Sequence, residues 1–222
     1  MKVQKKEPLV IKDCALIALA TGRKARTLKE LRDNLEIIES ESIYYHFWGS
    51  LLRPRFEDAE YHNDFAAWAA HSLNDKKMAE QLGVVDPTTF TTMDNLRFEL
   101  LEIIDERIDE LDVLPTASRD KQFEFISSEI VVFTTMQTVI EPEIMKTLVL
   151  ELSLGSIFYH FIDARRRTSE SIDDFSHWLM SFGDEYEDAI NGIADIDPYF
   201  SPLTDLRNQL SETLMNQIQD KK

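Results

Sequence analysis

Apolar residues recur every three or four positions along much of the chain, which is the spacing of one face of an α-helix. The clearest examples are residues 27–38 and 93–108, where Thr27 and Asp94 stand at positions suited to cap a helix N-terminus. The chain holds only 6 Gly and 7 Pro, so few residues interrupt these patterns. Alternation with a period of two is nearly absent, and long helices are therefore expected.

The periodicity alone does not decide the secondary structure of two apolar segments. Residues 14–20 (CALIALA) are too few to span a bilayer, and their Ala and Leu content favours a buried helix. Residues 129–140 (EIVVFTTMQTVI) are rich in β-branched side chains, which by propensity alone would suit a strand. An internal similarity aligns the second segment with the first, and we therefore predict that both are helices.

The similarity rests on short motifs that occur twice in the same order. Residues 42–47 (SIYYHF) match residues 156–161 (SIFYHF), and five of the six positions are identical. The later matches are Asp-Phe-x-x-Trp at 64–68 and 174–178, Asp-Pro at 86–87 and 197–198, and Leu-Arg at 96–97 and 206–207. We interpret these matches as an internal repeat, with a connection near residues 111–120.

The predicted fold class is accordingly all-α, with two sequence-related helical halves packed about a pseudo-two-fold axis. Residues 1–112 form the first helical repeat and residues 113–222 the second, either as two domains or as one compact domain.

The charge balance excludes some classes of partner. With 24 Lys+Arg and 41 Asp+Glu the formal net charge is −17, and an acidic surface repels nucleic acid and anionic membranes at long range. Neither is expected as a partner.

The cysteine content and the absence of known motifs limit the chemistry further. Cys14 is the only cysteine, so neither an intramolecular disulfide nor a multi-cysteine metal site can form, and a reducing cytoplasm is the expected compartment. The chain has no HExxH, GxSxG, GxGxxG or Walker sequence. No cofactor and no metal are expected.

A polar stripe on the most aromatic predicted helix carries the candidate chemistry. On a helix, Ser42, His46 and Arg53 fall within about 40° of one another. The second half repeats this stripe in Ser156, His160 and Arg167. Because apolar and aromatic residues surround the stripe, the helix is expected to be buried, and its His and Arg side chains need partners.

Two interpretations of the stripe remain open. In the first, each Arg pairs with a carboxylate of a neighbouring helix and each His is a satisfied core residue. In the second, the two stripes line an anion-sized cleft where arginines grip a phosphate or carboxylate and histidines donate hydrogen bonds. The candidate ligand-binding residues are Ser42, Tyr45, His46, Trp48, Arg53, Arg55, His160 and Arg167.

The leading functional hypothesis is a non-catalytic binding or accessory protein for a small anionic or sugar-phosphate ligand or a protein partner. The alternative is a hydrolase or transferase with His46 and Arg53 at its site and an acid such as Asp64 as base. A third hypothesis gives the repeated motif a structural role only. Asp64 and Asp174 precede apolar helices and are also predicted to act as N-caps.

The string IYYHFWGSLLRPRFEDAEYHNDFAAWA at residues 43–69 resembles the signature of a family of bacterial and archaeal proteins of unknown function. The preceding KDCALIALATGRKARTLKELRDNL resembles the opening segment of the same family. The resemblance covers residues 9–110, and the second half is similar only as a diverged copy. It implies a setting of α-glucan and trehalose metabolism, hence of sugars or sugar phosphates, and no catalytic residue can be carried over.

Overall fold

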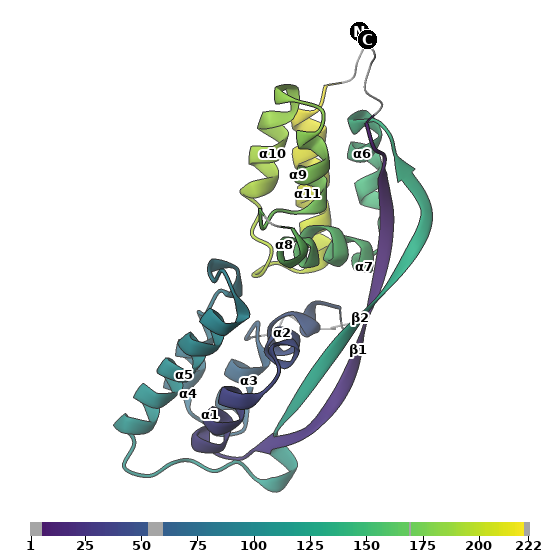
Figure 1. The fold of residues 1–222 in the computed structure, drawn as a ribbon. Coiled ribbons are helices and arrows are strands. Elements are labelled where there is room, and N and C mark those ends of the chain that lie inside the picture. Colours follow the sequence, from purple (N-terminus) through teal and green to yellow (C-terminus); the bar gives the residue numbers. More distant parts are fainter. Residues whose placement is uncertain (1–5, 53–59, 169, 220–222) are drawn as a thin grey trace. The chain divides into compact units, whose positions relative to one another are not determined.

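The computed structural model describes residues 6–52, 60–168 and 170–219, and it combines helices with one long β-ribbon. Strands β1 (Leu9–Ala25) and β2 (Phe123–Val139) pair with each other in antiparallel fashion (Figure 1). The hydroxyl of Thr21 donates to the carbonyl of Phe125 at 2.7 Å, and that of Thr135 donates to the carbonyl of Ile11 at 2.6 Å. The two strands are thereby joined near both ends.

The expected all-α class, two helical halves about a pseudo-two-fold axis, is wrong, because the fold is a mixture of helix and strand. The segments at 14–20 and 129–140, predicted as helices, lie largely within β1 and β2. The β-branched residues of the second segment were the informative signal. The Ala-rich first segment follows as a strand because β2 supplies the hydrogen-bonding partner for its backbone.

The chain forms two compact units, and each takes part of both strands. One unit holds residues 16–130 and is called here the α1–α5 unit; the other holds residues 1–15 and 131–222 and is called the α6–α11 unit. This division differs from the expected boundary between 112 and 113, because the ribbon returns residues 1–15 to the helices of the second half.

The helices of the α1–α5 unit follow the predicted periodicity closely. They are α1 (Leu28–Ile37), α2 (Ser40–Trp48), α3 (Asp64–His71), α4 (Lys76–Gly83) and α5 (Met93–Glu110). Thr27 caps α1 as predicted, since its side chain accepts from the Glu30 N–H at 3.2 Å. Helix α5 is capped by Thr92 and not by Asp94, which lies in the first turn.

Aromatic residues of β2 complete the core of this unit. The rings of Phe123 and Phe65 stack with centroids 5.1 Å apart, and Phe125 is buried beside Phe123. Between α4 and α5, Arg107 donates through Nε and Nη2 to the carboxylate of Asp75 at 2.9 and 3.0 Å.

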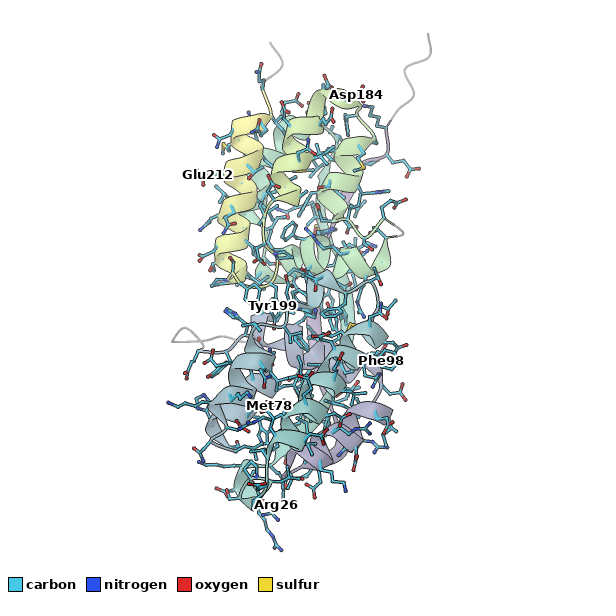
Figure 2. All side chains as sticks on the ribbon, turned by 90° about the vertical axis from the view of Figure 1, so that its left-hand side faces the viewer. Arg26, Met78, Phe98, Asp184, Tyr199 and Glu212 are labelled. Carbon is cyan, nitrogen blue, oxygen red and sulfur yellow. The ribbon has the colours of Figure 1, made fainter. Side chains whose placement is uncertain are left out.

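The α6–α11 unit contains α6 (Pro142–Leu148), α7 (Leu154–Ile157), α8 (Ala164–Arg167), α9 (Asp174–Met180), α10 (Glu187–Ala194) and α11 (Leu203–Gln217). A π-helical segment, Phe158–Asp163, joins α7 to α8 without a break. Met78 in the first unit and Tyr199 in the second are buried, whereas Glu212 on α11 is exposed (Figure 2).

Strand β1 packs tightly against the start of α7. A Cβ added at Gly155 would lie 2.5 Å from the Cys14 carbonyl oxygen, so only glycine allows this approach of helix and strand. Across the described residues, no helix is both long enough and apolar enough to cross a membrane.

Candidate functional site

Two side chains of α2 cover one residue of the β2 edge. The Ser42 hydroxyl donates to the Ile126 carbonyl at 2.8 Å, and the Ile126 N–H donates to His46 Nε2 at 3.1 Å. Ser42 and His46 are four residues apart on one helical face, so together they satisfy both backbone groups of Ile126. Both side chains are buried.

The second ring nitrogen of His46 is also engaged. His46 Nδ1 lies 2.9 Å from Asp64 Oδ2, and because Nε2 accepts a hydrogen bond, Nδ1 is the nitrogen that carries the proton. Asp64 is the first residue of α3 and does not cap it as predicted; the preceding residue, Asn63, is the N-cap and accepts from Ala66 N–H at 2.9 Å.

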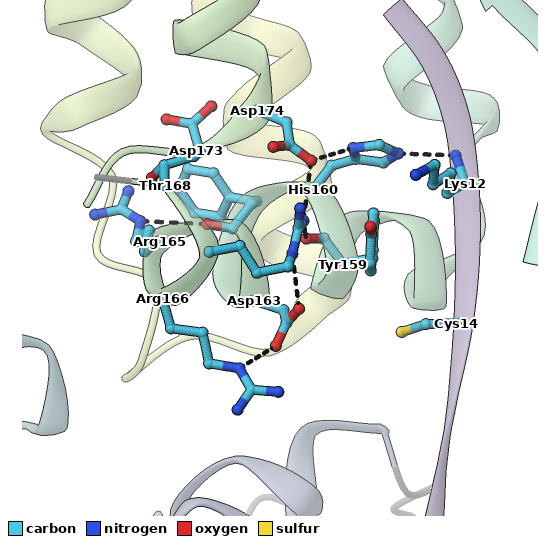
Figure 3. A network of polar contacts seen from close by, with 12 residues as sticks. Lys12, Cys14, Tyr159, His160, Asp163, Arg165, Arg166, Thr168, Asp173 and Asp174 are labelled. Atoms are coloured by element: carbon cyan, nitrogen blue, oxygen red, sulfur yellow. Dashed lines mark hydrogen bonds and ion pairs between the residues drawn. The ribbon is translucent and has the colours of Figure 1, made fainter. Parts of the chain in front are cut away.

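The α6–α11 unit holds the corresponding histidine in the same way. The Lys12 N–H of β1 donates to His160 Nε2 at 2.8 Å, and His160 Nδ1 lies 2.7 Å from Asp174 Oδ2 (Figure 3). The predicted cap is again displaced by one residue, since Asp173 is the N-cap of α9. Burial raises the pKa of the Asp173 carboxyl, although hydrogen bonds from Ser176 oppose the shift.

Arg167 extends this network on the other side of Asp174. Its guanidinium donates to Asp174 Oδ2 and Asp163 Oδ2, both at 3.0 Å, and to the Tyr159 carbonyl at 2.8 Å. It also lies over the Tyr159 ring, 4.0 Å from the centroid. Burial alone would raise the pKa of Asp174, but hydrogen bonds from His160 and Arg167 outweigh it and hold that pKa below its usual value.

The π-helical segment sets the positions of Tyr159, His160 and Asp163 in this network. Asp163 is buried and accepts from the Nε atoms of Arg166 and Arg167 (Figure 3). Sequence reasoning missed Asp163, although its spacing of four residues before Arg167 on a helix was a usable signal.

The remaining predicted site residues are distributed as follows. Tyr45 and Trp48 are buried on α2, and Ser156 is buried on α7. Arg53 and Arg55 lie outside the described residues. Ligand binding by these candidates therefore stays a prediction. The structural interpretation expected a carboxylate for each Arg, and Arg167 has Asp174 of α9, while His46 and His160 are hydrogen-bonded core residues that also contact Asp64 and Asp174.

Cys14 on β1 lies beside the start of α7. Its thiol donates to the Gly155 carbonyl at 3.3 Å, and burial, with smaller effects of Asp163 and Asp13, raises its pKa to about 12. Among the residues that the structure describes, no group of three or more His, Cys, Asp and Glu side chains is arranged to hold a metal ion.

We predict that His46→Ala and His160→Ala each lower the free energy of unfolding by about 1–3 kcal/mol, because each leaves a strand N–H without its acceptor. His160→Gln should recover part of the loss, since the side-chain oxygen of glutamine can accept from Lys12 N–H. Exposed His71 and His177 serve as matched controls, one in each unit, and their Ala variants should change little. Denaturant titration of the five variants and the wild type measures these losses, and equal losses at buried and exposed histidines would contradict the structural role of His46 and His160.

We also predict slow alkylation of Cys14 by iodoacetamide at pH 8. A thiol with a pKa of about 12 is ionised roughly a thousandfold less at pH 8 than one with the ordinary pKa of 9.0, so the folded protein should react slower by about that factor than the denatured chain. The high pKa also means that the thiol stabilises the fold below pH 9 and loses this effect as the pH rises toward 12. Similar rates in folded and denatured protein would contradict the burial of the thiol.

Comparison with known proteins places these features in a family. The solved structure of OrfY from Thermoproteus tenax is similar over 96% of this chain and 96% of its own, with 27% sequence identity and a TM-score of 0.82. No curated protein matches the sequence. The family of unknown function DUF5752 matches residues 6–215, nearly the whole chain, and the protein therefore belongs to that family.

Proposed function

We propose that this is a non-catalytic binding or accessory protein that holds a protein partner on the part of the ribbon in the α6–α11 unit. The observation that carries the proposal is a set of exposed apolar side chains on both strands there. These side chains are Val10, Val132, Phe133 and Met136, and Met136 is fully exposed. Exposed apolar side chains on neighbouring strands of a ribbon are typical of a protein interaction surface.

The chemistry of the histidines supports a binding role over the hydrolase or transferase alternative. A general base needs a ring nitrogen that can take a proton from substrate, but His46 and His160 each use Nε2 to accept from a strand and Nδ1 to bond a carboxylate. Asp64, the candidate base, is the carboxylate that bonds His46.

The internal duplication belongs to this proposal as well. Trp68 Nε1 donates to the Lys121 carbonyl at 2.8 Å, and Trp178 Nε1 donates to the Glu7 carbonyl at 2.9 Å. The tryptophans belong to the matched motifs, and each bonds the residue that leads into a strand. This correspondence supports two copies of one ancestral unit, which we place in a reducing cytoplasm because of the single cysteine.

A photo-crosslinking amino acid at position 136 tests the proposed surface. In cells that produce the protein, illumination should give a discrete adduct from position 136, because its side chain is exposed where the partner docks. The matched control is position 113, which is also exposed and apolar but lies outside the ribbon. Binding of the purified, identified partner should then fall at least tenfold in Met136→Lys and stay unchanged in Val113→Lys. The absence of an adduct at 136, or the same adducts at both positions, would contradict the proposal.

A further inference from the structure

Each strand of the ribbon has one edge that faces the other strand and one that faces away from it. Helix side chains bond backbone groups on the second edge over only part of the length of each strand. In the α1–α5 unit, Ser42 and His46 bond both backbone groups of Ile126 on β2. In the α6–α11 unit, His160 bonds the N–H of Lys12 on β1, so β1 is the strand beside the helices and β2 is the outer strand (Figure 1). The outer edge of β2 in the α6–α11 unit, residues 131–139, is called here the open edge.

The register of the ribbon identifies which residues point outward on the open edge. The two contacts that join the strands, Thr21 to Phe125 and Thr135 to Ile11, are ten residues apart on each strand, so neither strand gains a residue between them. Ile126 directs its N–H and C=O away from β1, and outward residues alternate along a strand. Val132, Thr134 and Met136 therefore point their backbone groups outward as well.

These outward groups have no partner in the chain as the structure describes it. No hydrogen bond from the backbone of Val132, Thr134 or Met136 to a helix is found among the described residues, which include the whole open edge. A strand edge with its N–H and C=O groups uncovered is a template for another strand. Two-stranded ribbons are also marginal by themselves and gain from added strands.

The composition of the open edge favours a second copy of the same chain as the occupant. Residues 131–139 (VVFTTMQTV) contain no charged residue, no Gly and no Pro, and six of the nine are β-branched. In a protein with a net charge of −17, an uncharged segment is where two copies can meet without direct repulsion. The open edge of one copy can thus serve as the template, and the same segment of a second copy can pair with it.

We propose that two copies of this protein pair antiparallel through the open edge of β2 and form one four-stranded sheet. This inference rests on the proposed function, since it names the partner of the same surface. Of the registers that pair outward residues, the one centred on Thr134 sets Val132 of each copy opposite Met136 of the other. Such pairing is isologous and closes as a dimer, so it does not continue into a fibre.

Sedimentation equilibrium of the purified full chain tests the pairing. The apparent mass should rise with concentration from 25.8 kDa toward twice that value. Thr134→Pro removes one outward N–H without touching the bonds to β1 and should weaken dimerisation at least tenfold, whereas Thr134→Val keeps the N–H and should dimerise like the wild type. In hydrogen exchange, the amides of Val132, Thr134 and Met136 should become protected as concentration rises.

A second pair of variants guards against a folding defect in Thr134→Pro. Met136→Lys should weaken dimerisation, while Val113→Lys, with the same change of charge at another exposed site, should not. A mass of 25.8 kDa at every concentration, or a dimer that neither Thr134→Pro nor Met136→Lys weakens, would overturn the inference. If the purified protein stays monomeric while position 136 still crosslinks to a different protein, the pairing fails and the proposed function stands. If neither association occurs, both fail.

Discussion

The hydrogen bond from a strand N–H to the Nε2 atom of a buried histidine is the interaction on which each unit depends. It joins β2 to α2 at Ile126 and His46, and β1 to the π-helical segment at Lys12 and His160. A strand edge buried against a helix has no neighbouring strand to satisfy its backbone, and an unmade bond of this kind costs about 1–3 kcal/mol. A carboxylate on Nδ1 fixes the ring in the tautomer that can accept.

The helices could be predicted from sequence and the ribbon could not. The spacing of apolar residues gave α1 within one residue at each end, and Thr27 caps it as expected. Strands β1 and β2 pair with each other although about 100 residues separate them along the chain, so the pairing itself leaves no local pattern, and the β-branched residues of β2 were the one local signal. The two aligned segments do share one secondary structure, but it is the strand favoured by the β-branched residues of the second and not the helix favoured by the Ala and Leu of the first.

Residues of the candidate site could be predicted from the sequence, but the groups that they contact could not. Helical geometry placed Ser42 and His46 on one face, and the structure uses them together. The sequence could not reveal that their partner is the backbone of Ile126, because a backbone group carries no residue signature. Asp64 is the first residue of α3 and follows the N-cap Asn63. Its carboxylate bonds His46 instead of capping the helix.

We propose a structural role for the histidines, which accounts for the recurrence of the motif without a reaction, and we propose the open part of the ribbon as the surface for function. Nitrogen-15 NMR of the imidazole rings tests this account most directly, because the ring nitrogen shifts distinguish both tautomers and the charged form. His46 and His160 should carry a proton on Nδ1 and none on Nε2, because each Nε2 accepts from a strand N–H. Rings protonated on Nε2, or rings that exchange freely between tautomers as His71 and His177 should, would contradict it.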